Sequence, residues 1–126
     1  PRWSQNVDDA ADDPILGYDN LMYTLHFYAG THKGWLRDKG DYAMSKGLAL
    51  FVTECGGMNA DGQGPIDVES VEEWVEWMDD NDISYLFWSV SDKKETCSML
   101  YPSAKSEGPW NEGDLSPWGR FVKEQL

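Results

Sequence analysis

The stretch Leu48-Ala49-Leu50-Phe51-Val52-Thr53-Glu54 decides the fold, because it is an apolar run that ends abruptly in a carboxylate. Two further runs rich in β-favouring residues lie on either side of it, at residues 21–28 and 84–90. The middle and last runs are almost continuously apolar, which is typical of strands in a parallel sheet covered on both faces. The three runs therefore predict three strands of a parallel sheet.

Helical patterns separate the predicted strands. The first pattern covers residues 35–46 and ends at Gly47, a suitable C-cap. It places on one face Leu36, Tyr42 and Ala43. The second covers residues 68–81 after the N-cap Asp67, and its apolar stripe consists of Val68, Val71, Trp74, Val75 and Met78. A third helix is predicted from Ser116-Pro117 to the end of the chain, because Ser116 is a suitable N-cap and Pro117 a suitable first-turn residue.

The predicted order is strand, helix, strand, helix, strand, helix, preceded by a polar loop over residues 1–20. This alternation predicts a parallel α/β fold. The loops after the strands are long, at 55–67 and 91–115, whereas those before them are short. Functional loops of a (β/α)₈ barrel follow the carboxyl ends of its strands, so the asymmetry favours a barrel. An open flavodoxin-like sheet would also alternate, but the sequence has no Gly-rich phosphate loop.

Composition narrows the class of partner. The 126 residues include 23 acidic and 10 basic side chains, for a net charge of −13 spread along the chain, which disfavours nucleic acid and anionic membranes. No apolar run approaches the roughly 18 residues of a membrane span. Seven Trp, six Tyr and four Phe suit either a core or a groove that stacks sugar rings. The chain begins Pro1-Arg2-Trp3 without Met or a signal peptide, so we expect a processed or truncated piece.

Three predicted strand ends carry side chains capable of chemistry or of ligand binding. His26 and Tyr28 leave the same face of the first strand, Glu54 ends the second, and Trp88 lies near the end of the third. Each one alone is explained as well by a structural role: a half-buried His or Tyr, an exposed strand-end Glu, a core Trp. Their joint occurrence at successive strand ends favours a common site.

On these residues the sequence resembles glycoside hydrolase family 5, and within it the bacterial endo-β-1,4-glucanase (cellulase) group. The resemblance covers nearly the whole chain in order. The segments that carry it are Trp3-Ser4-Gln5-Asn6-Val7-Asp8, residues 23–32 (YTLHFYAGTH), residues 49–54 (ALFVTE), Asn59-Ala60-Asp61-Gly62 and residues 88–95 (WSVSDKKE).

The resemblance implies that residues 1–126 are the C-terminal part of a single (β/α)₈ TIM-barrel catalytic domain, with about strands 6–8 and their helices. It implies that Glu54 is the nucleophile of a retaining mechanism, and that His26 and Tyr28 hold this nucleophile and the neighbouring sugar. The substrate-binding residues that it implies are Trp3, Ala60, Trp88, Lys93 and Glu95.

Two departures from the family pattern have consequences. The family's acid/base is a Glu in an Asn-Glu-Pro motif after the fourth strand, and this sequence has no such motif. We therefore expect the N-terminal half of the barrel to supply the acid/base as a partner, and the isolated chain to be inactive. The second departure is Cys55, where the family usually has an aromatic residue. We expect Cys55 and Cys97 to form a disulfide, as in exported proteins.

The leading interpretation is a secreted, extracellular endo-β-1,4-glucanase that acts on cellulose or a related β-glucan. No metal-ligand spacing accompanies the two cysteines, and no metal or cofactor is expected. A β-mannanase or xyloglucanase on the same barrel is an alternative, because fold does not determine substrate. A glucan-binding half-barrel without a complete catalytic pair is another.

Overall fold

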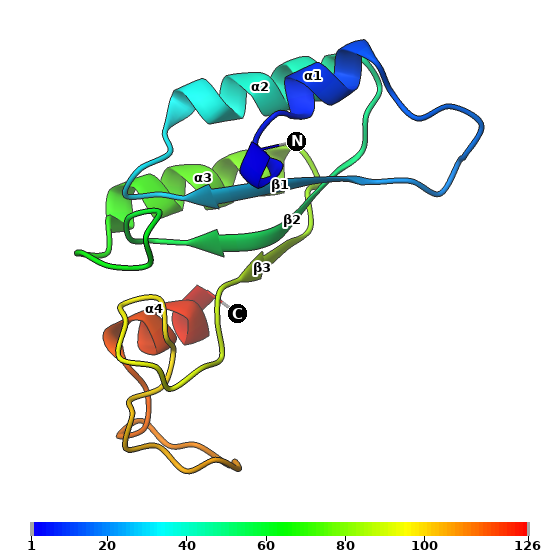
Figure 1. Cartoon of the computed structure of the whole chain (residues 1–126). Coiled ribbons are helices and arrows are strands. Elements are labelled where there is room, and N and C mark those ends of the chain that lie inside the picture. The colour runs from blue at the N-terminus through cyan, green and yellow to red at the C-terminus, as the bar shows by residue number, and fades with distance from the viewer. Residues whose placement is uncertain (1, 126) are drawn as a thin grey trace.

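A computed structural model describes residues 2–125 and contains one parallel sheet, with strands in the order β1-β2-β3 (Figure 1). The strands are β1 (Tyr23–Tyr28), β2 (Leu50–Gly56) and β3 (Tyr85–Phe87). The helices are η1 (Arg2–Ser4), α1 (Val7–Asp12), α2 (Gly34–Ser45), α3 (Val68–Asp80) and α4 (Pro117–Gln125). The predicted parallel α/β alternation is confirmed, although the third strand is shorter than predicted. Pro1 and Leu126 lie outside the described residues.

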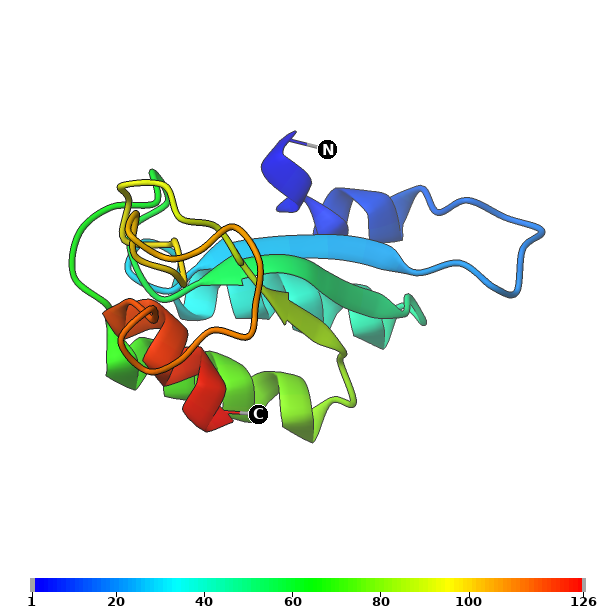
Figure 2. The ribbon, with the colours of Figure 1, turned by 90° about the horizontal axis from the view of Figure 1, so that it is seen from below.

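Helices α2, α3 and α4 lie on the same face of the sheet (Figure 2). Aromatic pairs join the two layers: Phe27 of β1 stacks on Trp74 of α3 with ring centroids 3.9 Å apart, and Phe87 of β3 meets Trp118 of α4 edge-on at 5.4 Å. Both tryptophans are fully buried. Such large aromatic side chains contribute much of the apolar area that a short chain can bury. The other face is less covered, since Leu86 of β3 is 55% exposed.

The predicted helix ends are confirmed. The Asp67 side chain accepts the Ser70 backbone N–H at 3.2 Å, and the Ser116 hydroxyl accepts that of Gly119 at 3.1 Å. Gly47 adopts a φ of 89° after α2, a left-handed conformation that favours glycine.

Two residues of the predicted apolar faces are exposed. Tyr42 turns outward and its hydroxyl donates to Asp12 of α1 at 2.6 Å. Val68 is the first residue of α3 and is 44% exposed, so the buried stripe of α3 begins after it, with Ser70 and Val71.

The prediction of a loop over residues 1–20 is wrong for its first half, which holds η1 and α1. Helix α1 is short and acidic, and it is held by contacts with α2 that its own sequence does not reveal. Lys39 pairs with Asp8 at 2.9 Å, and the hydroxyl of Tyr42 binds Asp12. Asp8 and Asp9 also lie in the first turn, where the helix dipole favours negative charge.

Strand β2 contains a β-bulge close to its carboxyl end. Thr24 pairs with Phe51 and His26 with Glu54, so two steps along β1 match three along β2. The same extra residue is found against β3, where Val52 pairs with Tyr85 and Cys55 with Phe87. Because side chains alternate between faces along a strand, one extra residue reverses the phase. Leu50 and Val52 are buried before the bulge and Cys55 after it, and Glu54 shares the face of His26.

No helix within residues 2–125 is long and apolar enough to span a membrane.

Candidate active site

A cavity of about 590 Å³ opens where the carboxyl ends of β1 and β2 meet. In a parallel α/β fold this edge of the sheet is where ligands bind. Its lining consists of Trp3, Gln5, His26, Tyr28, His32, Glu54, Ala60 and Asp61. The structure therefore brings together five of the residues named from the sequence and adds three that were not.

Glu54 and Tyr28 form the central contact of this cavity. The Tyr28 hydroxyl donates to Glu54 Oε1 at 2.7 Å, a short hydrogen bond to a carboxylate. Burial, followed by the hydrogen bond with Glu54, raises the pKa of Tyr28 well above its usual value, so its hydroxyl stays protonated and remains a donor.

A glycine makes this contact sterically feasible. Gly56 is the β2 partner of Tyr28, and a Cβ at Gly56 would lie 2.8 Å from two carbons of the Tyr28 ring. The ring therefore lies over a backbone without a side chain, and any larger residue would displace it.

His26 lies on the other side of the same carboxylate. Its Nδ1 is 3.8 Å from Glu54 Oε2, too far for a hydrogen bond but close enough for electrostatic attraction when the ring is charged. Its Nε2 is 2.8 Å from the hydroxyl of Thr53, which fixes the ring orientation. The two oxygens of Glu54 thus face two different residues of β1.

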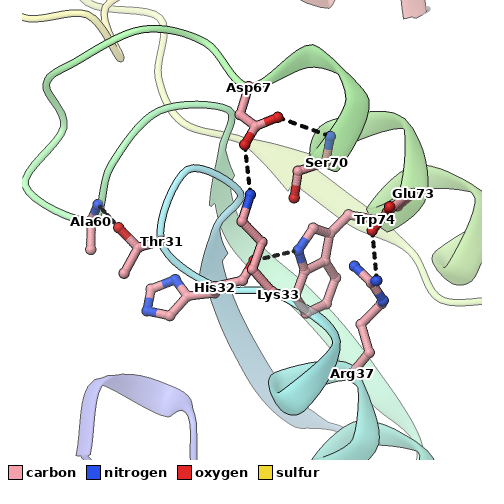
Figure 3. Close-up of polar contacts among 9 residues, drawn as sticks. All are labelled: Thr31, His32, Lys33, Arg37, Ala60, Asp67, Ser70, Glu73 and Trp74. Carbon is pink, nitrogen blue, oxygen red and sulfur yellow. Dashed lines mark hydrogen bonds and ion pairs between the residues drawn. The ribbon is translucent and has the colours of Figure 1, made fainter.

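The loop after β1 is fastened to the loop after β2. Thr31 Oγ1 accepts the Ala60 backbone N–H at 2.9 Å (Figure 3). The Gly30 N–H donates to the Met58 carbonyl at 2.9 Å. A Cβ at Gly30 would lie 2.7 Å from the Met58 backbone, so only glycine permits this approach. These contacts hold Ala60 at the wall of the cavity.

The same loop is tied to α3. The Lys33 ammonium pairs with Asp67 at 2.6 Å, and the Trp74 indole N–H donates to the His32 carbonyl at 2.9 Å (Figure 3). Lys33 lowers the pKa of Asp67, and the Ser70 N–H acts in the same direction. The wall of the cavity is therefore fixed to a helix whose inner face is buried.

Trp3 lies in η1 at the edge of the cavity and is 69% exposed. Trp3 and Ser4 have φ values of 50° and 53°, a left-handed conformation that is unfavourable for side chains other than glycine. Such residues cost about 1–3 kcal/mol each and persist where their surroundings hold them, often at ligand sites.

Trp88, Lys93 and Glu95 do not line this cavity. Trp88 follows β3, is 43% exposed, and its carbonyl accepts the Trp118 indole N–H at 2.7 Å. Lys93 and Glu95 lie in the loop after β3 and line a second cavity of about 400 Å³.

The expected disulfide between Cys55 and Cys97 is not formed, because both are buried free thiols. Their sulfurs have different neighbours. Cys55 Sγ donates to the Leu86 carbonyl at 3.5 Å, whereas Cys97 Sγ lies against Gly62. Burial raises the pKa of Cys97 to about 11 and raises that of Cys55 as well, so both thiols are protonated at neutral pH.

Three cavity residues, Gln5, His32 and Asp61, were not selected from the sequence. All three lie within the segments that carried the family resemblance, but none stands at a strand end. Gln5 precedes α1, whereas His32 and Asp61 lie in loops after β1 and β2. For His32 and Asp61, the available signal was their position in loops that follow strands.

Comparison with known proteins identifies the relatives of this chain. Residues 1–94 match the family model described as cellulase (glycosyl hydrolase family 5). An endoglucanase of Clostridium saccharobutylicum is 48% identical over 124 residues, which are 98% of this chain and 28% of that protein. The chain thus spans between a quarter and a third of that relative's length.

Solved structures agree with this relationship. A cellulase structure superimposes with a TM-score of 0.93 at 49% identity, over 99% of this chain and 38% of that one. The catalytic domain of a Thermobifida fusca endoglucanase in complex with cellotetraose superimposes with a TM-score of 0.83 at 26% identity, over 93% of this chain and 38% of that one. The predicted fold class, part of a TIM-barrel catalytic domain, is confirmed.

Proposed function

The chain belongs to the cellulase family of glycosyl hydrolases, family 5, and from this membership we propose that it carries the nucleophile of a retaining endo-β-1,4-glucanase. Glu54 is that nucleophile. The observation that carries the proposal is the hydrogen bond from the Tyr28 hydroxyl to Glu54 Oε1 at the cavity wall, because a nucleophilic carboxylate must be ionised and correctly aimed. Residues 1–126 form the C-terminal part of one barrel domain, with β1, β2 and β3 as its sixth, seventh and eighth strands.

In the proposed reaction a Glu54 oxygen attacks the anomeric carbon of a bound sugar. The glycosidic bond breaks, its electron pair remains on the departing oxygen, and a general acid protonates that oxygen. Water then hydrolyses the glycosyl-enzyme ester with the same residue acting as base. Tyr28 orients and stabilises the carboxylate before attack, and His26 contributes positive charge beside its second oxygen when protonated.

The general acid is a second carboxyl group about 5–5.5 Å from the nucleophile in retaining enzymes. Among the described residues, Asp61 is the other carboxylate that lines the cavity. Its Oδ1 accepts the Gln63 backbone N–H at 3.0 Å in an exposed turn, which suits a turn-stabilising acceptor more than a proton donor. We therefore assign the acid/base to the N-terminal half of the barrel, and we expect the 126-residue chain alone not to hydrolyse glucan.

The proposed substrate is a β-1,4-glucan. This assignment is supported by the endoglucanase relatives and by the cellotetraose bound to one of them. Exposed Trp3 would stack on a sugar ring, and Ala60 would contact it through its backbone. Trp88, Lys93 and Glu95 would bind sugar units further along the glucan. We propose secretion because the substrate is a polymer. Within residues 2–125 no disulfide adds support for this proposal.

The test replaces Glu54 by Gln in the complete protein encoded by the gene. We expect turnover of carboxymethylcellulose to disappear while cellotetraose binding, measured by calorimetry, is retained. Glu72→Gln on the exposed side of α3 is a matched control and should change neither property. Substantial hydrolysis by the Glu54 variant would contradict the assignment. Comparing mannan and xyloglucan as substrates tests the choice of glucan.

A further inference from the structure

His32 uses every polar atom it has. Its backbone N–H donates to the Tyr28 carbonyl at 2.8 Å, and its carbonyl accepts the Trp74 indole N–H. Its ring Nδ1 accepts the Tyr28 backbone N–H at 2.8 Å, and its Nε2 lies 3.0 Å from the Gln5 amide nitrogen. The ring points away from Trp74 (Figure 3). This one side chain therefore joins β1, whose Tyr28 holds Glu54, to the segment before α1.

These contacts determine where the ring proton lies. A backbone N–H can only donate, so Nδ1 of His32 must be the unprotonated acceptor. The side chain is buried, and burial lowers its pKa, which favours the neutral ring. A neutral imidazole with a bare Nδ1 carries its proton on Nε2. The ring nitrogen that faces Gln5 is therefore a donor.

A donor on His32 Nε2 requires an acceptor on Gln5. The amide nitrogen cannot accept, so the nitrogen–nitrogen contact of 3.0 Å is unsatisfied unless the amide is turned by half a rotation about its last bond. With the oxygen of Gln5 on His32, its NH₂ group is directed elsewhere. Gln5 is half-buried and lines the cavity.

The backbone before Gln5 is also constrained. Trp3 and Ser4 have the left-handed φ values described above, and the Gln5 backbone N–H closes this turn on the Arg2 carbonyl at 3.2 Å. The side-chain contact to His32 fastens this turn to the loop after β1. Exposed Trp3, in the same turn, also lines the cavity.

We propose that Gln5 is a substrate-binding residue whose amide oxygen accepts the His32 Nε2–H and whose NH₂ group donates to a hydroxyl of the bound sugar. His32 is its positioning residue. The proposal rests on the glucan-binding function proposed above, but its first test does not.

The first test locates the His32 proton by ¹⁵N NMR of the complete protein without ligand. We expect the neutral tautomer protonated at Nε2, with the Nδ1 resonance of an unprotonated acceptor, between pH 6 and 8. A proton on Nδ1, or a doubly protonated ring in this range, would overturn the amide orientation and the proposal with it. This measurement requires no catalysis and no knowledge of the substrate.

The second test measures cellotetraose binding by calorimetry in the Glu54→Gln background, where turnover is prevented. Gln5→Ala should raise Kd about three- to tenfold, as expected for loss of one neutral hydrogen bond. A melting curve for Gln5→Ala reports separately on any loss of stability. Gln125→Ala on α4 is the matched control and should bind like the parent.

The outcomes separate the two proposals. Parent-like binding by Gln5→Ala would reduce Gln5 to a structural role and overturn the inference, leaving the proposed function intact. No cellotetraose binding by the Glu54→Gln parent would overturn the proposed substrate and this inference together.

Discussion

Replacing Tyr28 by Phe tests the central contact of the candidate site. The change removes one hydroxyl, keeps the ring that lies over Gly56, and leaves Glu54 Oε1 without its donor at 2.7 Å. Hydrogen bonds to charged groups contribute about 1.5–3 kcal/mol. Since about 1.4 kcal/mol corresponds to a factor of ten in rate, the expected loss in kcat/KM is about 10- to 100-fold.

Partial access of water limits this loss. The Glu54 side chain is 26% exposed, so a water molecule can replace the missing hydroxyl in part. We therefore expect the lower half of the range. Fold stability should change little, because the aromatic packing is retained.

The assay is hydrolysis of a soluble cello-oligosaccharide by the complete protein, with a melting curve for each variant. Tyr85→Phe in β3 is the matched control, since the Tyr85 ring is half-buried against Phe87 and lies outside the cavity. It should retain the parent kcat/KM. A Tyr28→Phe enzyme within twofold of the parent would refute the view that this hydroxyl prepares Glu54 for attack.

Three further outcomes are expected. Gly56→Ala should displace the Tyr28 ring and lower kcat/KM at least as much as Tyr28→Phe does. Steady-state kinetics measure this loss, and a melting curve shows whether the variant remains folded. Asp67→Ala removes the cap of α3 and the partner of Lys33, and should lower stability by about 1 kcal/mol in denaturant titration at pH 7. Because the Asp67 pKa is depressed in the folded state, its charge stabilises the fold above the ordinary pKa of 3.8, and this contribution is lost as pH falls below it; the difference between parent and variant should therefore shrink below about pH 4. Cys97, with a pKa near 11 instead of 9.0, should react with a thiol reagent at pH 8 about 100-fold more slowly in the native than in the unfolded protein, and equal rates would contradict its burial.

The regular elements could be predicted because their signals are local. Apolar runs and helical stripes are written in short windows, and the caps at Asp67 and Ser116 depend on residues three positions apart. Helix α1 could not be predicted in this way, because its acidic turns are stabilised by Lys39 and Tyr42, which lie some thirty positions away.

The lining of the cavity was predictable at the strand ends, where Tyr28 and Glu54 lie. His32 was missed because its role depends on Gln5, which is brought near only by the fold. The disulfide prediction was wrong because the presence of two cysteines says nothing about the directions of their side chains. Cys55 and Cys97 are both buried, but each sulfur has its own neighbour.

The extra residue in β2 adds a side chain to the site without changing the direction of Glu54. If Thr53 were removed, regular alternation would still place Val52 and Cys55 toward the helices and Glu54 opposite His26 on the cavity side. The deletion would instead remove the hydroxyl that lies 2.8 Å from His26 Nε2. A relative one residue shorter in this strand should therefore keep the direction of its carboxylate and lose the support of its histidine.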